Sequence, residues 1–210
     1  IKAGTFVAPV HRQPLSNLAG SFIGREQELS EANAIWHKAR TGEGQVLLIG
    51  GEPGIGKARL AQELMAQERY DNATVLLGEC YAEGSAPFAP ITQMIQAAVD
   101  LRGLGDLGGL NASILADLIT FVPGLRERFP DVPPNLPLEP QAEQQRRFDN
   151  VANFFAALAA RAPVMFIVED AHWADSATLL LLRHLARRLR RARVLIIATH
   201  REAALDKTHL

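Results

Sequence analysis

Short apolar runs alternate with amphipathic stretches along most of this chain. Four runs are apolar almost without interruption and predict strands at residues 45–50, 73–80, 164–170 and 194–199, the first being of the kind found in strands buried on both faces. Apolar residues recur at helical spacing elsewhere and predict helices over 26–40, 57–67, 112–121, 141–162 and 177–191, with another near 91–101. This alternation predicts a parallel sheet with right-handed crossovers.

Two segments fall outside this alternation. Residues 81–140 form a long connection that contains the helices near 91–101 and 112–121, a flexible stretch at 102–109 and a Pro-rich loop at 130–140. Such length predicts an insertion on a core fold. Residues 1–20 show no period and predict a linker or arm ahead of a domain at 21–210.

Composition narrows the classes of partner. The 210 residues carry a net charge of -1, so no global field attracts nucleic acid or a membrane surface. No apolar run approaches the ~18 residues of a membrane span. The one cysteine, Cys80, cannot form an internal disulfide, which fits a reducing compartment, and we expect a cytoplasmic protein.

The stretch GGEPGIGKARLA at 50–61 is close to a phosphate-binding loop, G-x-x-x-x-G-K-[ST], between a strand and a helix. Its glycines let backbone N–H groups face phosphate oxygens, the helix N-terminus adds a positive dipole end, and Lys57 adds a charge. The alternative is a Gly-rich turn with a surface lysine. The residues expected to bind the cofactor ATP or ADP here are Glu52, Pro53, Gly54, Ile55, Gly56, Lys57, Ala58 and Arg59.

Carboxylates end the third expected strand, in VMFIVEDAHWAD at 164–175. Adjacent Glu169 and Asp170 would then lie at the edge of the sheet where ligands bind. One carboxylate can hold the water shell of Mg²⁺, and the other can orient or deprotonate an attacking water. The alternative is an acidic start to a loop.

The fourth expected strand ends in Thr199 and is followed by Arg201, in VLIIATHRE. If this strand lies between the acidic strand and the loop strand, Arg201 can reach a γ-phosphate. Alternatively, these residues are simply a polar strand end.

Two other polar stretches have structural interpretations. Six arginines between Arg183 and Arg193 cluster at a helix end, where cations are favoured, so nucleic-acid contact is the lesser hypothesis. His172 and Trp173 are interpreted as an aromatic plug between a strand end and the next helix. No second His or Cys stands at metal-ligand spacing, which argues against zinc.

Taken together, these motifs resemble the ATPase module of the STAND class, relatives of the AAA+ proteins. Such modules occur in large LuxR-type transcriptional regulators and in multidomain adenylate/guanylate cyclase-like proteins. The resembling motifs run from about residue 21 to 202 and are FIGREQEL (22–29), GEPGIGKARL (51–60), APFAPI (86–91), VEDAHWADSATLLLL (168–182) and ATHRE (198–202).

The resemblance implies a role for each matching residue. Phe22, Ile23, Gly24 and Arg25 match the segment that lies against the base and ribose. Glu169 matches the magnesium-associated position and Asp170 the water-activating one, while Arg201 matches a phosphate-sensing arginine. Members of the class act as switches that rest with ADP and, with ATP and an inducer, open to oligomerise. The implied partners are an adenine nucleotide, other domains of the same longer chain, and further copies of the chain.

Two departures from the family pattern affect the expected activity. Ala58 stands where a Ser or Thr hydroxyl normally binds Mg²⁺, so nucleotide binding can persist while hydrolysis is weakened. In addition, the chain ends shortly after the fourth strand, so we expect the fifth strand and the lid of such a module to be cut off.

We therefore expect a three-layer α/β P-loop NTPase fold with helices on both faces and, numbering strands along the chain, the order 2-3-4-1. The leading function is a nucleotide-binding regulatory switch of a larger signalling or transcriptional regulator, with weak or absent ATPase turnover. One alternative is a non-catalytic interaction scaffold, which the retained Lys57, Glu169 and Asp170 argue against. The other is a DNA-handling AAA+ ATPase, which the charge balance and the HWAD sequence argue against.

Overall fold

A computed structural model describes residues 24–68, 73–82, 86–102 and 110–201 of the chain. The expectations for the arm at 1–20, for Phe22 and Ile23, and for the stretch at 103–109 lie outside these residues. None of the described helices is long and apolar enough to cross a membrane.

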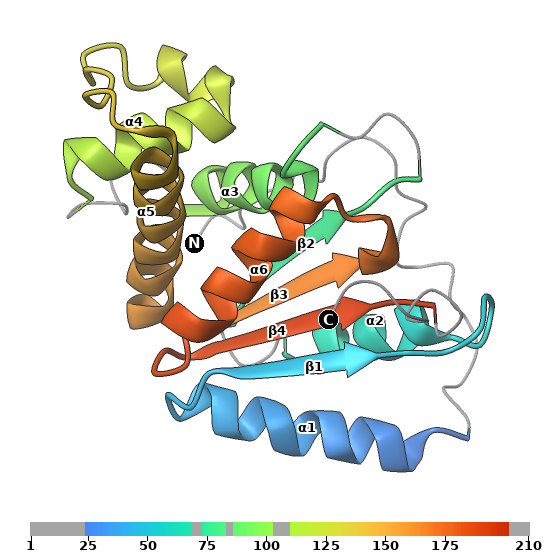
Figure 1. Cartoon of the computed structure of the whole chain (residues 1–210). Coiled ribbons are helices and arrows are strands. Elements are labelled where there is room, and N and C mark those ends of the chain that lie inside the picture. The colour runs from blue at the N-terminus through green and yellow to red at the C-terminus, as the bar shows by residue number, and fades with distance from the viewer. Residues whose placement is uncertain (1–23, 69–72, 83–85, 103–109, 202–210) are drawn as a thin grey trace.

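Four parallel strands form the central sheet: β1 (Gln45–Ile49), β2 (Thr74–Glu79), β3 (Val164–Glu169) and β4 (Val194–Thr199). Their arrowheads all point to the same side of the molecule (Figure 1). The spatial order is β1-β4-β3-β2, which confirms the predicted order read from the other edge. The carboxyl ends of all four strands therefore meet at one edge.

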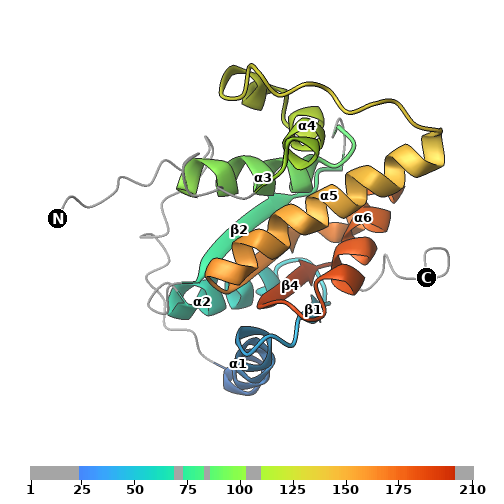
Figure 2. The same cartoon turned by 90° about the vertical axis from the view of Figure 1, so that its left-hand side faces the viewer.

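Helices cover both faces of this sheet (Figures 1 and 2). One face packs against α1 (Glu26–Arg40) and α2 (Lys57–Glu68), and the other carries α3 (Ala89–Arg102), α4 (Ala112–Phe121), α5 (Pro140–Arg161) and α6 (Ser176–Arg188). Successive side chains of β3 point to opposite faces of the sheet, and helices cover both faces, which explains the unbroken apolar sequence of this strand. Phe166 and Val168 face the α3–α6 side, whereas Met165 and Ile167 face the α1–α2 side. This is the predicted three-layer arrangement.

The expectation that β1 is buried on both faces is wrong. On the α1–α2 side, Ile49 is buried and Leu47 packs against the core. On the opposite side, Val46 is 47% exposed and Leu48 is 63% exposed. Among the described residues, β1 is one of the two edge strands, and the α6 side is left uncovered there. A continuous apolar run did not distinguish this one-sided strand from a two-sided one.

Residues 86–102 and 110–140 pack on the sheet and on α5. Helix α3 lies against β2, where a Cβ on Gly78 would come within 2.4 Å of the Pro90 carbonyl oxygen. Gln93 accepts a hydrogen bond at 2.8 Å from the backbone N–H of Glu79. Next come α4 and the short 3₁₀ helix η4 (Pro123–Glu127), and α4 packs against α5. The interpretation of 81–140 as an insertion on a core fold stays a prediction.

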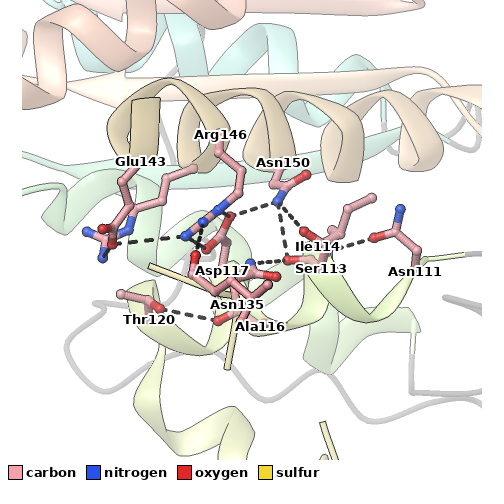
Figure 3. A network of polar contacts seen from close by, with 12 residues as sticks. Asn111, Ser113, Ile114, Ala116, Asp117, Thr120, Asn135, Glu143, Arg146 and Asn150 are labelled. Carbon is pink, nitrogen blue, oxygen red and sulfur yellow. Dashed lines mark hydrogen bonds and ion pairs between the residues drawn. The ribbon is translucent and has the colours of Figure 1, made fainter. Parts of the chain in front are cut away.

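A buried polar network fastens α4 to α5 (Figure 3). The Asp117 carboxylate is almost fully buried and accepts hydrogen bonds from Arg146 at 3.2 and 3.3 Å and from Asn150 at 2.7 Å. Arg146 also donates to the Leu136 carbonyl at 2.8 Å, and Asn135 donates to the Ser113 carbonyl at 2.9 Å. These contacts hold the Pro-rich loop against the two helices.

Two arginines of the arginine-rich stretch hold neighbouring elements together, while the question of nucleic-acid contact stays a prediction. Helix α6 ends at Arg188, before the predicted residue 191, and Leu189 is its C-cap. Arg188 pairs with Asp149 on α5 at 3.3 Å. Arg193 donates to the carbonyls that end α5, those of Ala159 and Ala160.

Candidate nucleotide-binding site

The loop between β1 and α2 has the backbone of an anion cradle. Gly54 and Gly56 have φ of +79° and +94°, values that strain any residue with a Cβ. A Cβ built on either glycine meets nothing within 4 Å, so both face open space. The loop therefore leaves room for a ligand at the N-terminus of α2, where the helix dipole favours negative charge.

Lys57 begins α2 and is folded into this loop. Its side chain is buried, and its ammonium group donates to the carbonyls of Gly51 at 2.8 Å and Glu52 at 2.9 Å. The side chain of a surface lysine on a Gly-rich turn would not be buried in this way. The ammonium group thus already lies inside the curve of the loop, where it can exchange a carbonyl for a phosphate oxygen.

The remaining loop positions form the rim of the cradle. Glu52, Pro53, Ile55 and Ala58 are exposed, and Arg59 pairs with Glu63 one turn along α2. Ala58 lies in the first turn of α2. An exposed position there could carry a hydroxyl without disturbing the packing.

Arg25 joins the segment before α1 to the loop. Its guanidinium donates to the Ile55 carbonyl at 2.6 Å, although the two residues are 30 positions apart. Gly24, with φ of +87°, donates from its backbone N–H to Glu26. The structure therefore brings Gly24 and Arg25 to the phosphate loop, while their predicted contact with base and ribose stays a prediction.

The predicted carboxylates lie at the end of β3. Glu169 is the last residue of the strand, and Asp170 follows in the left-handed region with φ of +53°. The Asp170 N–H donates to Thr199 Oγ1 at 3.0 Å, which ties the turn to β4. On the other side of β4, the His200 N–H donates to the Ile49 carbonyl, one residue before the loop begins. The acidic turn and the loop strand therefore flank β4, as the sequence predicted.

Arg201 lies beside the acidic turn. Its guanidinium carbon is 5.9 Å from the centre of the Trp173 ring, in a cation–π contact. Trp173 is partly exposed and belongs to η5 (Ala171–Trp173), the 3₁₀ turn between β3 and α6. This places His172 and Trp173 where the sequence put them, between the strand end and the helix.

His172 is the buried member of that turn. Its side chain is 6% exposed, and its ring lies 4.8 Å from that of Trp173. Burial lowers the pKa of His172; the charge of Asp170 opposes this shift, and the cationic groups of Arg201, Lys57 and His200 add to it. The ring is therefore neutral at pH 7.

The comparisons with known proteins agree with this geometry. The model of the AAA ATPase domain family matches residues 21–197. The chain belongs to this family. An uncharacterised protein of Rhizobium meliloti (strain 1021) is 26% identical over 198 residues, which is 88% of this chain but 19% of that protein. The chain thus spans about a fifth of the length of this curated relative.

Solved structures of AAA+ proteins are similar at low identity. C. elegans PCH-2 is 18% identical and has a TM-score of 0.40, covering 86% of this chain and 38% of that one. A chain of Drosophila ORC, bound to AT-rich DNA and Cdc6, is 17% identical with a TM-score of 0.39, covering 87% and 54%.

An AAA ATPase domain implies a nucleotide and typically Mg²⁺, and the residues present fit both. The open cradle at Gly54 and Gly56 suits phosphate oxygens. No three His, Cys, Asp or Glu side chains among the described residues are grouped so that they could hold a metal alone. A magnesium ion would therefore take most ligands from the nucleotide and water, as this ion usually does, with Glu169 holding its water shell.

Sequence reasoning missed two residues at this edge. Glu79 ends β2 directly opposite Glu169. The Tyr81 hydroxyl donates a hydrogen bond to the Glu79 carboxylate at 2.5 Å. This hydrogen bond is the main reason why the pKa of Tyr81 is raised. The available signal was a polar residue at the end of a second apolar run, in the sequence LLGEC. Between them lies the buried Cys80, whose pKa is raised to about 11 by burial and by the nearby Asp170 and Asp175 charges.

The structure also joins two sequence motifs that lie far apart in the chain. Phe88 of APFAPI has φ of +64°, and its N–H donates to Thr178 Oγ1 at 3.0 Å and to Asp175 at 3.4 Å. Asp175 is the aspartate of HWAD and caps α6 through the Thr178 N–H. These residues anchor the start of α3 to the turn that follows the acidic strand.

Proposed function

We propose that this chain is the nucleotide-binding switch module of a larger signalling or transcriptional regulator. It binds ADP or ATP and hydrolyses ATP weakly or not at all. The observation that carries the proposal is the loop around Lys57, with two open glycine positions and a buried ammonium group. The short coverage of the curated relative supports a module within a longer protein.

The role of each side chain follows from its place at the sheet edge. Lys57 and the loop backbone bind phosphates, Asp170 orients an attacking water, and Arg201 leaves Trp173 to reach the terminal phosphate. A bound magnesium ion would supply charge neutralisation at the phosphates. Contact of Gly24 and Arg25 with the base and ribose would couple nucleotide binding to α1, and the triphosphate state would favour assembly with further copies or with other domains.

The proposal is tested by calorimetric titration of the chain with ADP and ATP, with and without Mg²⁺. We expect binding of both nucleotides, and a loss of at least ten-fold in Lys57→Ala, because a desolvated charge-assisted contact contributes on the order of 1.5–3 kcal/mol. Lys38→Ala is the matched control, since this lysine is exposed in the last turn of α1 and is not among the residues expected to bind nucleotide. A folded chain that binds no nucleotide at millimolar concentration would instead be an interaction scaffold.

Weak hydrolysis is attributed to Ala58. Restoring the hydroxyl in Ala58→Ser should tighten Mg²⁺–ATP binding about ten-fold and leave ADP affinity without Mg²⁺ unchanged, because one inner ligand of the ion is regained. Any turnover should rise in the same variant and disappear in Ala58→Ser/Asp170→Asn. Asn tolerates the left-handed conformation of this position, so that change is confined to the charge. Equal turnover and equal Mg²⁺ dependence with Ala and with Ser would refute this attribution.

A further inference from the structure

The His172 ring is buried without any hydrogen-bond partner. Both ring nitrogens are shielded from solvent, and neither has a partner among the described residues. The nearest candidate, Asp170 Oδ1, is 3.8 Å from Nδ1, too far for a hydrogen bond. An unsatisfied buried polar group costs about 1–3 kcal/mol, so two such atoms in one side chain require an explanation.

The surroundings of His172 favour an anionic acceptor. The ring lies in the turn that follows the acidic strand, next to Trp173 and near the guanidinium of Arg201 stacked on it. In addition to burial, the cationic groups of Arg201 and Lys57 lower the pKa of the ring. The turn η5, the segment after β4 and the start of α2 all lie at the carboxyl edge of the sheet, where they present a ring N–H and two permanent cations. Phosphate oxygens satisfy both the donor and the cations.

We propose that the ring N–H of His172 donates a hydrogen bond to the terminal phosphate of a bound nucleoside triphosphate, and so distinguishes a triphosphate from a diphosphate. This inference rests on the proposed function. It adds a recognition residue beyond the loop lysine and Arg201. It also gives the buried ring N–H an acceptor, which none of the described residues supplies. Trp173, in ring contact with His172, serves as a built-in reporter of the same event.

The test compares ATPγS with ADP by calorimetry on the whole chain. We expect His172→Ala to lower ATPγS affinity about ten-fold, the scale of one charge-assisted hydrogen bond, and to leave ADP affinity within two-fold. His172→Asn keeps an N–H donor and should retain most of the ATPγS affinity. Trp173→Phe is the control for disturbance of the turn and should change neither affinity by more than two-fold.

The outcomes separate this proposal from the function on which it rests. Equal losses for both nucleotides, or no loss for either, would overturn the role of His172 while leaving nucleotide binding intact. A wild-type chain that binds neither nucleotide would overturn both.

If His172→Ala does not fold, a chain that keeps His172 but lacks the Arg201–Trp173 contact still decides the question by fluorescence. In Arg201→Ala, Trp173 emission should change with ATPγS and not with ADP, and the change should vanish when Trp173→Phe is added. The other tryptophan, Trp36, is buried in the α1 core and should not respond. The same change with both nucleotides would overturn the proposal.

Discussion

Two polar regions of this molecule differ in how completely their groups are paired. In the network between α4 and α5, the buried Asp117 carboxylate accepts from both Arg146 and Asn150 (Figure 3). At the carboxyl edge of the sheet, the Lys57 ammonium is paired with loop carbonyls, and the His172 ring has no partner among the described residues. A network whose polar groups are all paired stabilises the fold. Polar groups that are held in place without a charged or hydrogen-bonding side-chain partner are available to bind a ligand.

The largest expected effect comes from breaking the satisfied network. Asp117→Ala leaves the Arg146 guanidinium largely buried without its carboxylate, so we expect the free energy of unfolding to fall by about 2–3 kcal/mol, somewhat below the cost for a fully buried pair because Arg146 is 20% exposed. Urea denaturation measures this change. The matched control is Glu143→Ala, which removes a partly exposed partner of Arg146 and Arg147 and should cost under about 1 kcal/mol.

Measuring the nucleotide affinity of the folded Asp117→Ala variant tests whether the α4–α5 network is separate from the nucleotide site. It should stay within about two-fold of wild type, since the network makes no contact with the phosphate loop. Equal destabilisation by Asp117→Ala and Glu143→Ala would show that the network is not the stabilising device inferred here.

The fold was predictable because its signals are local. The strand–loop–helix order around Lys57 and the carboxylates that end β3 indicated which edge carries the site, and apolar runs located the strands. The order of the sheet was predicted from the motifs at the strand ends together with the family resemblance. Burial of β1 was not predictable, because a strand at an edge and a strand in the centre share the same apolar sequence. The Asp117 network and the register of Glu79 with Glu169 depend on pairings between residues far apart in the chain, which no local pattern encodes.

The next prediction concerns the open cradle. Gly56→Ala places a Cβ at φ of +94°, so we expect a loss of about 1–2 kcal/mol in the free energy of unfolding. The same Cβ enters the open space of the loop, so nucleotide affinity of the folded variant should fall at least ten-fold. Thermal denaturation and calorimetry measure the two effects.

Gly124→Ala is the matched control for this change. Gly124 also faces open space, but it lies in η4 with no positive φ, and the change should be neutral or stabilising by about 0.4–1 kcal/mol. If Gly56→Ala bound nucleotide as tightly as Gly124→Ala, the cradle would not be where the phosphates lie.

The smallest expected effect lies at a hydrogen bond that holds the acidic turn to β4. Thr199→Val keeps the shape of a nearly fully buried side chain but removes the acceptor for the Asp170 N–H, so we expect a loss of about 1 kcal/mol in the free energy of unfolding. The loss stays small because the Asp170 side chain is half exposed and water can reach the turn. Thr199→Ser keeps the hydroxyl and isolates the cost of the methyl group. Because this turn also carries His172, which is proposed to donate to the terminal phosphate, Thr199→Val should weaken ATPγS binding about three-fold more than ADP binding, as measured by calorimetry. A Ser variant as impaired toward ATPγS as the Val variant would mean that packing, and not this hydrogen bond, positions the turn.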